Sequence, residues 1–318
     1  MIIIKKKLKH QITLNYELKQ PIDFKKTFYS PTRFKSGLEL YDMINNWYYL
    51  PLNLGFDIFG LKFYMQYQQL SVGVFSEQKL GEVVLEKIRP IIDSIVILDD
   101  KFIKFYEKYS QDRFIHNIIQ KDKGIYNVRM YSLYEKLIVS TYLQNATVQR
   151  TIDMCQNMLD QYGTLLQFDN IELNAMWQPK DLTAGSEELR ALKVGYRDKN
   201  ILRITDHFVK NEIDEQKLWQ LPTDQLEKEL LKIYGVGKQT VFYIIGRSEY
   251  LKHISPWERK ILSKYIFDKD LCEEKFLVNW FKENYKDMCG LAFSLIFNDI
   301  FDQHKKKPFL WLQKIMRE

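Results

Sequence analysis

The fold of this chain is decided by the stretch Leu230-Leu-Lys-Ile-Tyr-Gly-Val-Gly-Lys-Gln-Thr240. An apolar helical run precedes the glycines and a second one follows them, which predicts two helices joined by a tight turn. Gly235 and Gly237 allow a positive φ and the close approach of a ligand, and a helix that starts near Gly237 points free N–H groups outward, where a phosphate oxygen can accept them. The turn alone leaves two interpretations open, a phosphate-binding hairpin or an ordinary corner with a glycine helix cap.

Length, composition and charge describe an ordinary globular chain with a mild preference for anionic partners. The 318 residues are long enough for one large domain or two to three smaller ones. The net charge of +6 and the pI near 8.9 suit an anionic partner without requiring one. Base stacking is one use for the 14% of aromatic residues, and an AT-rich coding sequence is another explanation of them.

Cysteines and histidines give no sign of a metal centre. Cys155, Cys272 and Cys289 are too few and too scattered for a zinc site or an iron–sulfur cluster, so we expect free, mostly buried thiols. The five histidines show no spacing typical of metal ligands. The N-terminus has too short an apolar run for a signal peptide, and no run of 18 apolar residues occurs. We expect a protein of the cytoplasm, or of the nucleus in a eukaryote, with no membrane partner.

The periodicity of apolar residues changes along the chain. Alternation with period two over residues 12–18, 61–67 and 69–74 predicts antiparallel strands, and helices are expected from Pro21 and from Gly81. From about residue 98 onward the period is helical almost throughout. We therefore predict an N-terminal α+β domain over 1–98 and a helical domain over 99–318. The expected helices of the second domain cover 99–109, 111–120, 132–143, 148–162, 186–192, 198–210, 223–233, 257–265 and 287–303.

Four segments in this order resemble the helix-hairpin-helix (HhH-GPD) DNA glycosylases. The first is the opening strand and proline-led helix over residues 12–24, and the second is the helix over 133–143 with the polar residues 144–147. The third, Leu189-Arg-Ala-Leu-Lys-Val-Gly-Tyr-Arg-Asp-Lys199, is similar to the family's Leu-Arg-x-Leu-Gly-x-x-x-x-Lys. The fourth, residues 231–240, matches the hairpin, normally Leu-Pro-Gly-Val-Gly. The resemblance covers nearly the whole chain and is specific to the branch of 3-methyladenine glycosylase II and 8-oxoguanine glycosylase.

This resemblance implies a mainly α fold, in which two helical subdomains flank a DNA- and base-binding cleft behind an α+β domain with an antiparallel sheet. The partner would be double-stranded DNA, bound by a monomer without an iron–sulfur cluster, in base excision repair. One DNA phosphate would contact the hairpin at Gly235, Val236, Gly237 and Lys238. A K⁺ or Na⁺ would bind the backbone carbonyls of Leu231, Ile233 and Val236.

A polar wedge is also implied, which fills the hole left when a nucleotide is flipped out of the duplex. By position this wedge is Gln144 or Asn145. The alternative is that these amides only cap the two adjoining helices.

The catalytic pattern departs from the family at two positions. Most members carry an Asp at the N-cap of the helix after the hairpin, and aligning the basic and apolar pairs that follow places Ser255 there. Ser255-Pro-Trp-Glu258 is a capping box, with Ser at N-cap, Pro at N1 and Glu at N3. Members with lyase activity carry a Lys two residues after the second glycine, where this chain has Gln239, so no Schiff-base lyase activity is expected.

Two functional interpretations remain open. In the first, the chain is a monofunctional glycosylase in which Glu258 supplies the carboxylate, although the same side chain is needed to close the capping box. In the second, the fold binds DNA without cutting the glycosidic bond, as a lesion sensor or modified-base reader. The recognised base cannot be read from the sequence, although Trp257, Tyr142, Phe242 and Tyr243 are candidate pocket walls.

Overall fold

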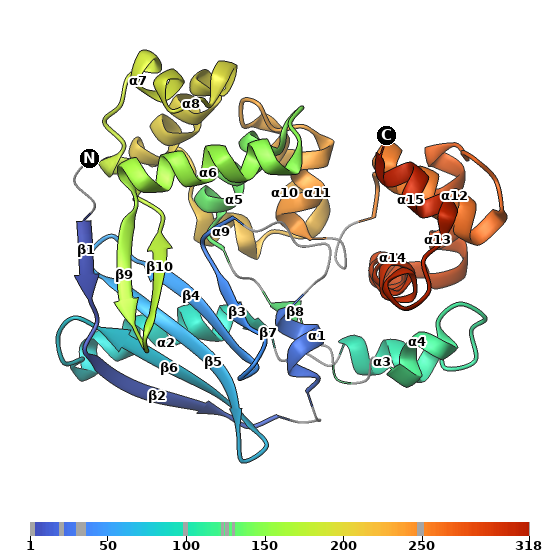
Figure 1. Ribbon diagram of the computed structural model, residues 1–318, viewed down its shortest axis with the longest axis horizontal. Coiled ribbons are helices and arrows are strands. Elements are labelled where there is room, and N and C mark those ends of the chain that lie inside the picture. The colour runs from blue at the N-terminus through green and yellow to red at the C-terminus, as the bar shows by residue number, and fades with distance from the viewer. Residues whose placement is uncertain are drawn as a thin grey trace. The chain divides into compact units, whose positions relative to one another are not determined.

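A computed structural model describes residues 4–18, 22–29, 36–97, 101–121, 124, 127–128, 131–246 and 251–317 (Figure 1). Contacts divide the chain into two compact units. The first unit comprises residues 1–29, 34–99 and 124–217, and the second comprises 30–33, 100–123 and 218–318. Residues 98–100 lie outside the described part, so the domain boundary expected at residue 98 stays a prediction; the contacts group the helices between 133 and 209 with the strands.

The first unit is built on a five-stranded antiparallel sheet, here called the large sheet. Its strand order is β2-β6-β5-β4-β3, and the register places Leu14 opposite Val72. All three strands expected from period-two alternation belong to it, and their antiparallel pairing is confirmed. The strands are β2 (His10–Tyr16), β3 (Leu40–Asp42), β4 (Trp47–Asn53), β5 (Ile58–Gln66) and β6 (Gln69–Ser76).

Both faces of the large sheet are covered, which is why its central strands are apolar on both sides. On one face, aromatic and aliphatic side chains of the sheet pack against α1 (Phe24–Phe28) and α2 (Glu82–Ile95). Asp23 caps α1 by accepting from the Lys26 amide at 3.0 Å, while Pro21, where this helix was expected to begin, lies outside the described residues. A two-stranded ribbon of β7 (Val96–Ile97) and β8 (Asn127–Val128) completes this part.

On the other face lies a small sheet that the sequence analysis did not predict (Figure 1). It joins β1 (Ile4–Lys7) in parallel to β9 (Thr164–Phe168), which forms a hairpin with β10 (Ile171–Ala175). The prediction that the chain is helical almost throughout after residue 98 is therefore wrong at 164–175. Asp169 and Asn170 form the turn with φ of 47° and 61°, and two successive positive φ angles are typical of tight hairpin turns.

Two helices of the first unit begin at side-chain caps that the sequence predicts. Ser132 and Glu135 form a capping box at α5 (Leu133–Leu143), and Thr147 accepts from the Arg150 amide at the start of α6 (Val148–Tyr162). These helices confirm the two that were expected around the polar interruption at 144–147. The remaining elements are η1 (Pro179–Asp181), α7 (Ser186–Ala191), η2 (Gly195–Arg197), α8 (Asp198–Val209) and α9 (Glu215–Gln220), whose last residues belong to the second unit.

All described elements of the second unit are helical. Its core is aromatic, with the rings of Phe293 and Phe297 stacked at 5.8 Å on one helix and Phe281 at 5.5 Å from Phe293. Two of its helices, α13 and α15, were not predicted. The helices are α3 (Lys101–Lys108), α4 (His116–Lys121), α10 (Thr223–Lys232), α11 (Lys238–Ile245), α12 (Pro256–Phe267), α13 (Glu274–Tyr285), η3 (Lys286–Met288), α14 (Cys289–Lys306) and α15 (Leu310–Arg317).

The structure bears on the state of the cysteines and on membrane-spanning helices. All three cysteines are free, and Cys155 and Cys272 are buried, as expected. Among the described residues, no helix is both long enough and apolar enough to cross a membrane.

Phe168 should be a main stabilising contact between the small and the large sheet. Its side chain is 2% exposed, with ring centroids of Phe75 at 5.2 Å and Tyr49 at 6.0 Å. We expect Phe168→Ala to lower the free energy of unfolding by about 3 kcal/mol, because it removes buried ring area and leaves a cavity. Urea unfolding followed by circular dichroism measures this. The control Phe56→Ala, at a ring that is 59% exposed, should cost less than about 0.5 kcal/mol; equal losses in both variants would contradict the packing role of Phe168.

Candidate functional site

The hairpin between α10 and α11 is a tight turn that depends on one glycine. Helix α10 ends at Lys232, and the amide of Val236 donates to the carbonyl of Ile233 at 3.1 Å. This bond closes a four-residue turn whose third residue, Gly235, has φ of +80°. A positive φ at this position is what a type II turn requires, and glycine adopts it without strain.

The second glycine leaves open space in front of a helix start. Gly237 is the N-cap of α11 with an ordinary φ of −106°, and a Cβ placed on it would meet no atom within 4 Å. Neither backbone conformation nor packing among the described residues therefore requires glycine here. No side chain caps α11, so its first amides point outward beside the exposed side chains of Lys238 and Gln239. An anion can approach this helix start closely.

The expected cation ligands lie at the other end of the turn. The carbonyls of Leu231 and Ile233 belong to the C-terminal end of α10, where the helix dipole is negative and carbonyl oxygens lack partners within the helix. The Ile233 oxygen accepts from the Val236 amide and keeps a second lone pair. Neutral oxygens of this kind fit a monovalent cation, and its binding at Leu231, Ile233 and Val236 stays a prediction.

The two candidate wedge residues differ in exposure. Gln144 is the C-cap of α5 and is partly buried, whereas Asn145 is exposed and has φ of +48°. Asparagine tolerates this left-handed conformation better than most residues. The polar side chain that projects furthest from the helix junction is therefore that of Asn145.

A buried arginine donates hydrogen bonds to the backbone at the junction between α5 and α6. Arg197 is 1% exposed, and its guanidinium donates to the carbonyl of Thr141 at 3.1 Å and also to that of Gln144. Burial lowers the pKa of Arg197 from its ordinary value, while the nearby Tyr196 side chain opposes this effect. An arginine nevertheless stays charged in proteins, so a cation satisfies the carbonyls at the negative end of α5.

An exposed aromatic ring lies beside Asn145. Tyr196 is 57% exposed, its hydroxyl is 3.4 Å from the Asn145 amide nitrogen, and its ring centroid is 4.8 Å from the Arg197 guanidinium carbon. The sequence analysis quoted this segment only for its resemblance and missed both residues as functional candidates. Tyr196 and Arg197 follow a turn in which Lys193 and Gly195 both have positive φ.

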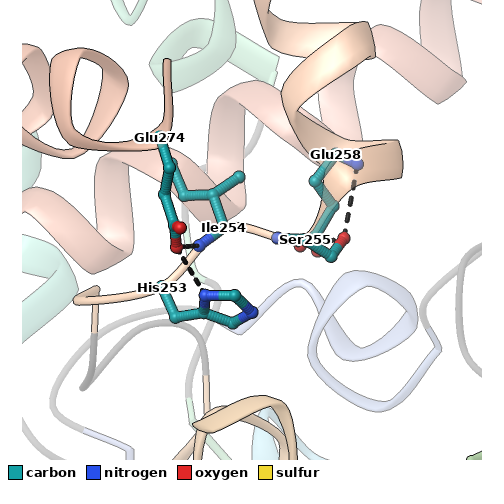
Figure 2. Close-up of polar contacts among 5 residues, drawn as sticks. All are labelled: His253, Ile254, Ser255, Glu258 and Glu274. Atoms are coloured by element: carbon teal, nitrogen blue, oxygen red, sulfur yellow. Dashed lines mark hydrogen bonds and ion pairs between the residues drawn. The ribbon is translucent and has the colours of Figure 1, made fainter.

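The start of α12 has the geometry of a helix cap, and Figure 2 shows its side chains. Ser255 is the N-cap, and its hydroxyl accepts from the Glu258 amide at 3.3 Å. The Glu258 carboxylate in turn accepts from the Ser255 amide at 3.0 Å and from the Ser255 hydroxyl at 2.8 Å. The predicted capping box is thus confirmed. Glu258 is 1% exposed, so its carboxylate is directed back to the helix start; a catalytic role for it stays a prediction.

The segment that leads into α12 is attached to two other helices. Lys252 forms ion pairs with Asp224 and Glu227 of α10, the latter at 2.8 Å. Glu274, in the first turn of α13, accepts from the Ile254 amide at 3.0 Å and pairs with the Nδ1 atom of His253 (Figure 2). These contacts fix the backbone immediately before Ser255. The pair of His253 and Glu274 was not predicted from the sequence, because α13 was not predicted.

The charge of Glu274 is stabilised in the fold. Burial raises the pKa of this carboxyl. The hydrogen bond from the Ile254 amide and the charges of His253 and Arg259 together have the larger, opposite effect, so the pKa of Glu274 lies below its ordinary value. Glu274 is therefore an ionised partner for His253 at neutral pH.

The four candidate pocket walls differ in exposure, and Tyr243 is half-buried. Tyr142 and Phe242 are 1% and 2% exposed and belong to the cores of their units. Trp257, in the first turn of α12, is 39% exposed and packs against Phe297 and Phe301 at 5.7 and 5.8 Å. Trp257 is thus the candidate that a bound base can reach most readily.

The predicted site residues fall into two groups. The hairpin, Gln239, Ser255 and Glu258 belong to the second unit, where α10 is attached to the segment before α12. Gln144 and Asn145 belong to the first unit, together with Tyr196 and Arg197. Each group is held by contacts within its own unit.

Solved structures of DNA glycosylases are similar to this chain. A 3-methyladenine DNA glycosylase from Archaeoglobus fulgidus is similar with a TM-score of 0.72 and 14% identity, over 91% of this chain and 99% of that one. The Clostridium acetobutylicum 8-oxoguanine glycosylase/lyase, in complex with double-stranded DNA containing cytosine opposite 8-oxoguanine, is similar with a TM-score of 0.67 and 16% identity, over 89% of this chain and 93% of that one. No protein-family model matches the sequence, and no curated protein sequence matches it. The chain has the helix-hairpin-helix glycosylase fold that its four segments predicted.

Glu274 should make stability depend on pH in the acid range. Because its pKa is lower in the folded than in the unfolded chain, its ionised form stabilises the fold above the ordinary carboxyl pKa of 4.5, and this contribution is lost as the pH falls through the folded-state value. We expect Glu274→Gln to cost up to about 1 kcal/mol at neutral pH, reduced by solvent screening because the side chain is 37% exposed. The difference from wild type should shrink as the pH falls below 4.5 and be lost below the folded-state pKa.

Urea unfolding across this pH range measures the effect. The matched control is Glu273→Gln at the neighbouring N-cap residue, whose side chain makes no capping hydrogen bond. A pH-independent difference for Glu274→Gln would contradict the assignment.

Proposed function

We propose that this protein is a monofunctional DNA glycosylase, which binds duplex DNA, flips a damaged or modified base and hydrolyses its N-glycosidic bond in base excision repair. The observation that carries the proposal is the uncapped start of α11, where Gly237 leaves open space that the fold itself does not use. The likeness to glycosylases over nine-tenths of the chain supports it. A DNA phosphate at the hairpin would accept the amides that no side chain caps.

The junction between α5 and α6 would support the flipped state. An exposed amide at Asn145 can hydrogen-bond an orphaned base, and the exposed ring of Tyr196 beside it offers a stacking surface. Arg197 would act only indirectly, by holding the carbonyls of Thr141 and Gln144 from within the core.

A K⁺ or Na⁺ bound by the carbonyls of Leu231, Ile233 and Val236 would add positive charge near the same phosphate. The residues of this chain contribute only backbone oxygens to it, so the hairpin conformation set by Gly235 decides whether the ligands converge.

A second candidate function is favoured by the start of α12. The expected catalytic carboxylate is replaced by Ser255, and the nearest acid in sequence, Glu258, is buried in the capping box. A protein that binds and flips a base without cutting, as a sensor or reader, is consistent with that arrangement. In either case Gln239 has no amine, so no Schiff-base lyase step is expected.

Lys238 should contact a DNA phosphate. We expect Lys238→Ala to weaken binding to every duplex to a similar degree and to reduce the slope of log affinity against log salt by about one, because one fewer counterion is released. Fluorescence anisotropy over a range of salt concentrations measures this. The control Lys217→Ala removes an exposed lysine that pairs with Asp214 at 2.9 Å and should leave the slope unchanged; an unchanged slope for Lys238→Ala would exclude the contact.

Base release should persist when the charge of Glu258 is removed. Glutamine at N3 also closes a capping box, so Glu258→Gln keeps the start of α12 while it removes the carboxylate. We expect its single-turnover rate to stay within about threefold of wild type on duplexes that carry 8-oxoguanine, alkylated purines, deaminated bases or enzymatically modified bases.

A loss of about 100-fold or more in a folded Glu258→Gln protein would instead assign the chemistry to this carboxylate. If the wild-type protein binds these duplexes but releases no base from any of them, the reader function replaces the glycosylase.

A further inference from the structure

The imidazole of His253 lies next to the position where the family's carboxylate is missing, and nothing described so far uses it. His253 is two residues before Ser255, its side chain is 21% exposed, and its Nδ1 atom is bound to Glu274 (Figure 2). In the part of the chain that the structure describes, the Nε2 atom makes no hydrogen bond. Figure 2 shows this second nitrogen directed away from Glu274.

Burial along the segment places His253 and Ser255 on a common side. Ile254 between them is 0% exposed, whereas both neighbours are partly exposed. Alternating burial of this kind is typical of extended chain, in which residues i and i+2 share a side. Two residues of extended chain span at most about 7 Å, so the imidazole lies within side-chain reach of the N-cap position.

Glu274 sets which nitrogen of the neutral imidazole is free to accept a proton. In the neutral ring, a carboxylate bound to Nδ1 keeps the ring proton on that nitrogen and leaves the lone pair on Nε2. The same arrangement, a carboxylate that orients an imidazole, activates nucleophiles on unrelated folds.

The pair is also held firmly. The Ile254 amide donates to the same carboxylate at 3.0 Å, and the Lys252 ion pairs attach the preceding residue to α10. The ring position is therefore fixed by three helices, α10, α12 and α13.

We propose that His253 is the general base of the glycosylase reaction and that Glu274 is its positioning residue, in place of the missing carboxylate at Ser255. This inference rests on the proposed glycosylase function. The oxygen of a water molecule forms a bond to C1′ of the flipped nucleotide while the bond between C1′ and the base nitrogen breaks, and its electron pair leaves with the base. The water proton moves to Nε2 of His253 and from there to the departing base or to solvent. Water is the co-substrate, and no oxidant or reductant is needed.

The test is single-turnover base release at saturating protein, with DNA affinity measured separately. The probes are duplexes carrying 8-oxoguanine or an alkylated purine. We expect His253→Ala to slow base release by about 100-fold or more, because general bases contribute rate factors of this size, while the Kd for the same duplex changes less than about threefold. Free imidazole added to His253→Ala should restore part of the rate. Glu274→Gln should lower the rate and not the affinity, since its amide can still accept from Ile254.

The chain contains a matched control. His207 on α8 also pairs through Nδ1 with a glutamate, Glu212, but this pair lies at the C-terminal end of its helix in the first unit. His207→Ala should leave both rate and Kd unchanged and should not respond to imidazole.

The outcomes distinguish this inference from the function it rests on. If wild type releases base and folded His253→Ala does so at an equal rate, the general-base role is overturned and the glycosylase function stands. If His253→Ala raises the Kd by about 100-fold but keeps the rate at saturation, His253 binds phosphate instead, and the inference is likewise overturned. If wild type releases no base from any probe, both proposals fail. Should His253→Ala not fold, Glu274→Gln decides alone: an unchanged rate overturns the inference.

Discussion

The backbone amides at the first turn of α12 need hydrogen-bond acceptors, and side chains of this chain supply them. This requirement decides which charges are left at the start of the helix. Ser255 and Glu258 satisfy the amides reciprocally, and Ser255 stands at the position where the sequence resemblance led us to expect an Asp. An Asp at an N-cap can accept an amide and still present charge outward. A serine can do the first task with its hydroxyl oxygen but cannot do the second. The helix start is therefore capped, while the cap itself carries no outward-facing negative charge.

Helix ends explain the other candidate positions as well. Helices α5, α6 and α12 all begin with side-chain caps, from Ser132, Thr147 and Ser255. Helix α11 begins with Gly237 and has none. At the C-terminal end of α5, the guanidinium of the buried Arg197 donates to the carbonyl of Thr141. The described helices α8, α10, α13 and α14 also start without a side-chain cap. The start of α11 differs in its place beside the hairpin, where a Cβ on Gly237 would meet no atom within 4 Å.

How much the sequence could predict depended on whether the signal was local. Alternation predicted three strands of the large sheet, and Ser-Pro-Trp-Glu predicted the start of α12 to the residue, because both are set by neighbours along the chain. The β9–β10 hairpin was missed because its strands are short and follow a long helix, although Asp169-Asn170 is a turn signal. Glu274 and Arg197 could not be found in this way, since their partners His253 and Thr141 are distant in sequence and only tertiary packing brings them together.

The parallel pairing of β1 with β9 has a consequence for the order of assembly. Neighbouring strands from β3 to β6 are consecutive hairpins, so each pairing closes only a short loop. Ile4, in contrast, pairs with Thr164, and the cost of loop closure grows with the length of chain between two partners. Contacts between residues so far apart also slow folding. During synthesis β1 is made before the whole large sheet and the helices α5 and α6, which all precede its partner strand, so β1 must wait unpaired while the meander beside it forms.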